Sequence, residues 1–246
     1  MKASIVKKVL ATLFWVAAWH ILAVCMGNPL LLPTPVQVLR KLGQLIVTAE
    51  FWQITAVSIG RILLGVVSAM VLGVVLAVLT TASSLLDALI GPVMTVMKAT
   101  PVASITILVL IWLDRDLVPV LICAMMVMPV VWSNVCAGIR AADPQLLEMA
   151  KAYRLPRGRV LRRIYVPTVL PYFRAACSSA LGLGWKAGIA AEVLTVPGKS
   201  IGRMISDSKL YLMTEELFAW TLVVLILSLL LQKIMLRLLA GRDPDA

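Results

Sequence analysis

The chain has 246 residues, of which 61% are apolar and 14% are charged. Soluble domains average about 45–50% apolar and about 25% charged residues, so this composition excludes an ordinary soluble protein and indicates a membrane protein. The net charge of +11 would suggest nucleic-acid binding in a soluble chain. Here the cations gather between hydrophobic runs, as membrane topology signals do, so we expect a lipid bilayer and no nucleic acid as partner.

Hydrophobic runs of about 20 residues recur along the chain, each long enough to cross a bilayer as a helix. The first follows three lysines and lacks a small-residue cleavage site, so we interpret it as an uncleaved helix rather than a signal peptide. Residues 36–48, after Leu32-Pro33-Thr34-Pro35, have the spacing of a helix lying at the membrane surface. The sequence predicts an all-α membrane protein with a single transmembrane domain, 1–246, and six transmembrane helices, at 9–26, 55–80, 85–113, 117–139, 165–194 and 217–239.

The distribution of lysine and arginine orients these six helices. With a cytoplasmic N-terminus, thirteen cations lie inside: Lys2, Lys7, Lys8, Arg140, Lys151, Arg154, Arg157, Arg159, Arg162, Arg163, Lys233, Arg237 and Arg242. Six lie outside: Arg40, Lys41, Arg115, Lys199, Arg203 and Lys209. Cytoplasmic loops carry the excess of positive charge, so both termini are expected in the cytoplasm.

The most basic segment, 140–164, is predicted to hold a short helix on the cytoplasmic side. Asp143 followed by Pro144 is a helix start, because the carboxylate caps the first turn and proline needs no N–H there. Four apolar residues share one helical face: Leu146, Leu147, Ala150 and Tyr153. The residue before Pro156 disfavours helix, so the helix should end near Arg154. From these residues alone, a solvated helix packed on lipid head groups is an equal alternative to a docking helix.

Several charged residues fall inside the predicted spans, where a charge costs about 3 kcal/mol or more unless it is paired or wetted. Arg61 and Arg174 are expected near helix ends, where their side chains can reach the interface. Lys98 precedes Pro101, which breaks the helix, and Lys186 and Glu192 lie six residues apart. Two interpretations stay open: a buried Lys98–Glu192 ion pair, or a cationic translocation path that suits an anionic substrate.

The basic segment resembles the permease subunits of ATP-binding-cassette importers, in particular the sulfonate/nitrate/taurine branch. Glu148-Met149-Ala150 is similar to the Glu-Ala-Ala of the cytoplasmic signature, and Ile164-Tyr165-Val166-Pro167 is similar to its exit. The likeness extends from about residue 30 through motifs in the order of this branch: Leu32-Pro33-Thr34-Pro35, Lys98-Ala99-Thr100-Pro101, Arg140-Ala141-Ala142-Asp143-Pro144 and Ala190-Ala191-Glu192. One departure stands out, since Arg154 occupies the place of the signature glycine. We expect Pro156 and Gly158 to move the left-handed turn by two to four residues.

The resemblance implies the type I importer permease fold, with a coupling helix between transmembrane helices 4 and 5. It implies a homodimer in a bacterial inner membrane, two ATPase subunits that bind ATP and Mg, and an extracytoplasmic substrate-binding protein. The coupling contact would involve Glu148, Met149, Ala150, Tyr153, Arg154, Pro156 and Gly158.

Catalytic and metal-binding patterns give no competing assignment. The sequence contains no P-loop, no GxSxG, no HExxH and no EF-hand pattern, so we expect no enzyme activity, metal or cofactor in this chain. The alternative functions are a transporter or channel that works without an ATPase, and a membrane scaffold. Inverted repeats would favour the former, and the sequence has no internal repeat.

Overall fold

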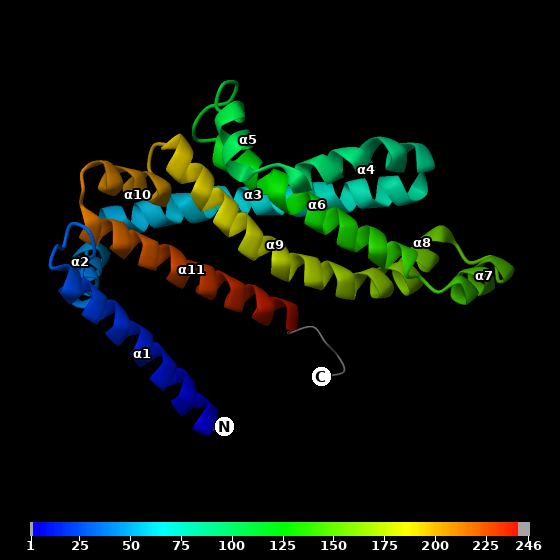
Figure 1. The fold of residues 1–246 in the computed structure, drawn as a ribbon. Coiled ribbons are helices and arrows are strands. Elements are labelled where there is room, and N and C mark those ends of the chain that lie inside the picture. Colours follow the sequence, from blue (N-terminus) through cyan, green and yellow to red (C-terminus); the bar gives the residue numbers. More distant parts are fainter. Residues whose placement is uncertain (1, 241–246) are drawn as a thin grey trace.

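In the computed structural model, which describes residues 2–240, the chain forms helices joined by short connections (Figure 1). The long helices are α1 (Lys2–Met26), α3 (Ala49–Ala82), α6 (Val118–Arg140), α9 (Val166–Thr195) and α11 (Thr214–Ala240). The shorter ones are α2 (Pro35–Ile46), α4 (Ser84–Ala99), α5 (Val102–Val109), α7 (Pro144–Ala152), α8 (Arg157–Val160) and α10 (Ile201–Leu210). A π-helical segment, Leu161–Tyr165, joins α8 to α9. The fold is all-helical, as predicted.

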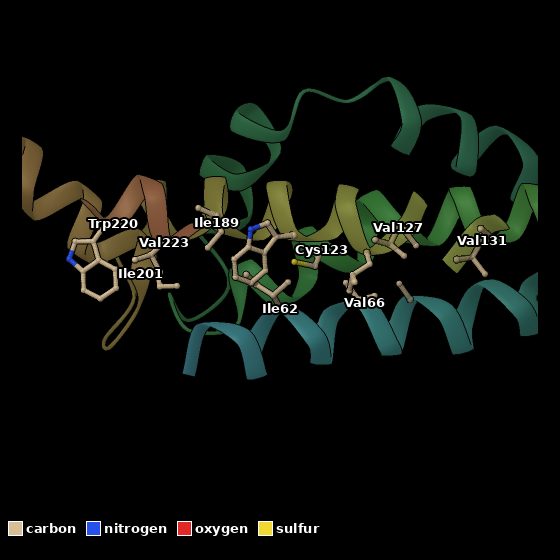
Figure 2. Packing of buried hydrophobic residues seen from close by; sticks show 14 of the residues in the cluster. Ile62, Val66, Cys123, Val127, Val131, Ile189, Ile201, Trp220 and Val223 are labelled. Atoms are coloured by element: carbon tan, nitrogen blue, oxygen red, sulfur yellow. The ribbon is translucent and has the colours of Figure 1, made fainter. Parts of the chain in front are cut away.

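The centre of the molecule is the packing of α3, α6 and α9, whose buried side chains are shown in Figure 2. Small residues let the three backbones approach closely. A Cβ added at Gly65 would lie 2.6 Å from the Cβ of Cys123, and one added at Gly188 would lie 2.6 Å from Ile62. Lipid tails are as apolar as leucine, so helices in a membrane gain from such close van der Waals contact rather than from burial alone.

The third predicted span is not one helix. α4 and α5 meet at an angle of 107° around Thr100 and Pro101, whereas Pro92 stays inside α4 without ending it. Pro101 has no N–H and disfavours helix at the residue before it, so the chain turns there. The segment 85–113 therefore holds two helices with a sharp bend at Pro101, and the prediction of one continuous helix is corrected.

α1 stands apart from the rest of the chain (Figure 1). Its contacts gather near its C-terminal end, where Trp19 donates a hydrogen bond to the carbonyl of Pro33 and stacks on Phe218 of α11. α2 begins at the predicted break, with Thr34 and Gln37 forming a capping box. Its buried face includes Val38 and Leu42, whereas Leu39 is exposed.

Four helices are long and apolar enough to cross a membrane, or five spans if the bent α4–α5 pair counts as one. α9 coincides with the fifth predicted span, but it carries Arg174, Lys186 and Glu192 and is not among the apolar helices. The exact count of six spans therefore stays a prediction. The observed helices otherwise match the predicted ranges to within a few residues at most ends, although α1 starts earlier, at Lys2, and α3 also starts earlier, at Ala49.

The two ends of the molecule carry the two predicted sets of cations. α7 and α8 lie at one end of the bundle, and α2 and α10 lie at the other (Figure 1). This separation fits the predicted orientation, with α7 and α8 on the cytoplasmic side. Arg242, which was counted among the inside cations, lies outside the described residues.

Candidate functional site

The predicted cytoplasmic helix is present as α7, between α6 and α9. The Asp143 carboxylate accepts a hydrogen bond of 2.8 Å from the backbone N–H of Gln145, and Pro144 occupies the first turn. This start is the one predicted from the Asp-Pro pair. The carboxylate satisfies an N–H that would otherwise have no partner, and it complements the positive end of the helix dipole.

The turn that ends α7 corrects the sequence-based expectation. Arg154 itself adopts the left-handed conformation, with φ of +49°. The N–H of Leu155 donates to the carbonyl of Ala150 at 2.9 Å, and the N–H of Arg154 donates to that of Lys151 at 3.0 Å. These two bonds form a Schellman motif, which normally places glycine at the left-handed position. Pro156 and Gly158 therefore do not move the turn; the arginine takes the conformation for which the family uses glycine.

α7 is anchored through Ala150, which is 3% exposed and packs with Ala142 and Ile164. Leu147 and Leu155 close this small cluster from the sides. Ala150 is therefore buried within this chain, and its predicted part in the coupling contact stays a prediction. Methyl-sized Ala150 forms the seam between α7 and the π-helical segment, which leads directly into α9.

The outward face of α7 is apolar and belongs to a different set of residues. Leu146 is 43% exposed, Met149 is 49% exposed and Tyr153 is 76% exposed. Their spacing of three and four places them on one side of the helix. Glu148 is also exposed, as are Arg154, Pro156 and Gly158. Tyr153, Glu148 and Met149 are thus exposed, and their part in a coupling contact stays a prediction.

Glu192 is the most deeply buried charged residue of the described chain, with no exposed surface. Arg61 Nη1 donates to its Oε1 at 2.8 Å, and Ser58 Oγ donates to its Oε2 at 2.9 Å. The backbone N–H of Gly202, in the first turn of α10, donates to Oε2 at 3.2 Å. α3, α9 and α10 thus meet at one carboxylate. Such a charge is tolerated because it is both paired and fully hydrogen-bonded.

The partner of Glu192 corrects the predicted pair. Within residues 2–240 no ion pair joins Lys98 to Glu192; the cation on Glu192 is Arg61. Arg61 also bonds to Asp116 at 2.8 Å, in the connection before α6, and its side chain is 10% exposed. Arg61 lies in the fourth turn of the 34-residue α3. The sequence singled out Arg61, but its pairing depends on contacts across 131 residues, which no local pattern reveals.

The two remaining predicted residues, Lys98 and Lys186, are both exposed inside or beside spans. Lys98 lies in the last turn of α4, two residues before the bend, with its Nζ 6.0 Å from the centre of the Trp132 ring. Lys186 lies near the middle of α9, between the buried Trp185 and Ala187. Among residues 2–240 neither lysine has an ion pair with an acidic side chain, so both can hold an anion, whereas the Arg61–Glu192 pair holds helices together.

Metal chemistry has no support in the described part of the chain, where no cluster of three or more His, Cys, Asp or Glu residues could hold an ion. The described residues offer α7 with an exposed apolar face at one end, the hydrogen-bonded Arg61–Glu192 pair at the other, and two exposed lysines, Lys98 and Lys186.

Known proteins are similar to this chain in fold or in sequence. A solved structure described as an amino acid ABC transporter with histidines has the same fold, with a TM-score of 0.61 over 81% of this chain and 95% of that chain, at 16% identity. The taurine transport system permease protein TauC of Escherichia coli (strain K12) is 26% identical over 91% of this chain and 82% of its own length. The nitrate import permease protein NrtB of Leptolyngbya laminosa is 28% identical over 71% of this chain and 66% of its own length.

These relatives come from the branch that the sequence motifs indicated, and the type I importer permease fold is confirmed. The family described as "Binding-protein-dependent transport system inner membrane component" matches residues 69–244, which is well over half of the chain. The match covers α4 to α11. It includes α7, the bend at Pro101, and Glu192, which pairs with Arg61. The protein therefore belongs to the family of inner membrane components of binding-protein-dependent transport systems.

Proposed function

We propose that this chain is the transmembrane permease subunit of an ATP-driven importer for a small anion such as a sulfonate, taurine or nitrate. Family membership and the names of the relatives support the transport class. The chain itself performs no chemistry in this proposal. Two partner ATPase subunits bind ATP and Mg²⁺, and an extracytoplasmic binding protein delivers the anion.

The coupling contact is the exposed apolar face of α7, formed by Leu146, Met149 and Tyr153. It fits a groove on a soluble ATPase, because apolar side chains this exposed on the cytoplasmic side lose water contact when they are covered. Behind this face, Ala150 packs on Ile164 of the π-helical segment. That segment continues into α9 without a break, so a displacement of α7 would be passed to the helix that carries Lys186.

The anion path is lined by Lys98 and Lys186, with the bend at Pro101 beside it. An uncompensated lysine facing lipid costs about 3 kcal/mol or more, so its exposure is better explained by a water-filled path or by the surface of a second copy. One chain supplies one wall, and a homodimer closes the path with the same residues from both sides.

The membrane placement follows from the same charges. We place the chain in a bacterial cytoplasmic membrane, as a single permease domain with both termini and the 140–164 loop in the cytoplasm. A membrane-impermeant thiol reagent should label Arg159→Cys from the cytoplasmic side only. The control is Arg115→Cys, which should be labelled only from outside.

The observation that carries this proposal is α7, an anchored cytoplasmic helix with an exposed apolar face. Its test is uptake of taurine or nitrate by proteoliposomes that hold this chain together with a partner ATPase and an extracytoplasmic binding protein. Uptake should require ATP inside. Lys186→Ala should lower the uptake rate at least tenfold and Lys186→Arg less, while Lys199→Ala, which removes an extracytoplasmic lysine, should not. Uptake that proceeds equally without ATP would instead establish the ATPase-independent transporter.

A further inference from the structure

An apolar groove of about 470 Å³ runs along the side of the α3–α6–α9 centre. Its walls come from the end of α3, the end of α6, the π-helical segment and the start of α9. The lining residues are aliphatic or aromatic except for one threonine: Val74, Val78, Thr81, Ala82, Val135, Ile139, Leu161, Tyr165, Val166, Val169, Leu170 and Phe173. Several of these side chains are widely exposed, including Val78 at 52% and Leu161 at 58%.

In the orientation proposed above, on which this inference rests, the groove lies in the cytoplasmic half of the membrane. α3 ends at Ala82 and α6 ends at Arg140, and the groove uses only the last turns of both helices. From Leu161 to Phe173 the helix rises about 18 Å. Half of a hydrocarbon core is about 15 Å thick. The groove is therefore deep enough for the length of one acyl chain in the inner leaflet.

A cationic cup lies beside the cytoplasmic end of this groove. Arg159, Arg162 and Arg163 line it together with Pro156 and Gly158. All three arginines are exposed, and none of the ion pairs between described residues involves them. Guanidinium groups hold phosphate through two parallel N–H donors, so three of them around one hollow form a suitable phosphate site.

The cup and the groove share one short stretch of chain. Leu161 lines the groove, and its neighbours Arg159 and Arg162 line the cup. We propose that this juxtaposition binds one anionic phospholipid of the inner leaflet, with its phosphate in the arginine cup and an acyl chain in the groove. Basic pockets between transmembrane helices on the cytoplasmic side are known to hold anionic head groups. The lipid would brace the hinge between α7 and α9.

The charges favour a lipid over the other two occupants. A second copy docked symmetrically here would bring its own three arginines against these three, because a two-fold interface presents the same patch from both subunits. A soluble ATPase could reach the arginines, but it could not fill a groove that faces the hydrocarbon core. A phospholipid satisfies the positive and the apolar parts together.

The test uses the full chain purified in detergent, with dioleoylphosphatidylglycerol and dioleoylphosphatidylcholine as probes. Native mass spectrometry should show one retained phosphatidylglycerol per chain, and this lipid should raise the melting temperature more than phosphatidylcholine does. The triple variant Arg159→Gln, Arg162→Gln, Arg163→Gln should weaken phosphatidylglycerol binding roughly a hundredfold. Its control, Arg40→Gln, Arg115→Gln, Lys209→Gln, removes the same charge from the opposite end and should bind normally.

The groove is tested separately. Val78→Trp fills it and should abolish the phosphatidylglycerol effect, whereas Val75→Trp changes an equally exposed α3 valine outside the lining and should not. Glycerol 1-phosphate should not reproduce the stabilisation. Equal binding of both lipids, full stabilisation by glycerol phosphate, or a Val78→Trp variant that changes only the dimer population would each overturn the proposal. Loss of ATPase attachment with unchanged lipid binding in the triple glutamine variant would do so as well.

Discussion

Arg61 and Glu192 are 131 residues apart in the sequence and form a buried ion pair of 2.8 Å. Ser58, one turn before Arg61, bonds to the same carboxylate, and its Oγ also accepts the N–H of Ile201 at 2.8 Å. Through these bonds α10 is fixed against α3 and α9. Asp116 extends the network to the α5–α6 connection and accepts the N–H of Gly198 at 3.2 Å. The network around Arg61 and Glu192 thus joins α3, α9, α10 and the α5–α6 connection.

Removing either partner of this pair should leave a buried charge without compensation. Arg61→Met should lower the free energy of unfolding by about 3–5 kcal/mol, and combining it with Glu192→Gln should recover part of that loss. A double-mutant cycle in mixed micelles should give a coupling energy of about 1 kcal/mol or more. The control cycle, Lys98→Met with Glu192→Gln, should be additive; coupling there would restore the pair expected from the sequence.

The exposed arm of the network should matter less. The Asp116 side chain is 56% exposed, so its bond to Arg61 is screened by water. Asp116→Asn should cost about 1 kcal/mol or less in the same unfolding measurement. A loss as large as that of Arg61→Met would show that the α5–α6 connection, rather than the buried pair, holds this end together.

A glycine is required at position 202 because the start of α10 lies too close to α9 for a side chain. A Cβ added there would lie 2.3 Å from the Cβ of Glu192 and 2.4 Å from its backbone carbon, so the start of α10 must shift. Gly202→Ala should lower the free energy of unfolding by about 1–3 kcal/mol, which is the usual effect of adding atoms to a well-packed site. The matched control is Gly158→Ala, where nothing lies within 4 Å; it should be neutral or slightly stabilising. Equal melting temperatures for the two variants would contradict the close approach of α10 to α9.

Arg154 should accept glycine with a gain in stability. A left-handed conformation costs a non-glycine residue about 1–2 kcal/mol, and part of the relief is offset by the greater freedom of glycine in the unfolded chain. Arg154→Gly should therefore raise the free energy of unfolding by about 0.5–1 kcal/mol, and Arg154→Val should lower it. If valine is tolerated as well as glycine, the turn is not left-handed at this position.

Substitutions on the exposed face and on the buried face of α7 should have different effects, the first on coupling to the ATPase and the second on stability. Tyr153→Ala changes an exposed residue, so unfolding should be unaffected while ATPase attachment and ATP-dependent uptake fall. Ala150→Leu overfills the cluster with Ala142 and Ile164, so it should destabilise the loop by about 1–3 kcal/mol. Co-purification with the ATPase and thermal unfolding together distinguish them. Unchanged attachment in Tyr153→Ala would place the docking surface elsewhere.

The sequence by itself determined the membrane class, most of the helix ranges outside the bent α4–α5 pair, the start of α7 and the family resemblance. These follow from local physics: apolar runs match the bilayer thickness, an Asp-Pro pair caps a helix, and cations stay on the cytoplasmic side. Only the tertiary structure decided the partner of Glu192, because an ion pair across 131 residues depends on how α3 and α9 cross. The tertiary structure also decided which face of α7 is buried. Ala150 and Met149 are adjacent in sequence, but Ala150 is buried because it packs against Ile164, whereas Met149 is exposed. Arg154 is the third case: its side chain disfavours a left-handed turn locally, and the two hydrogen bonds of the completed motif hold it there.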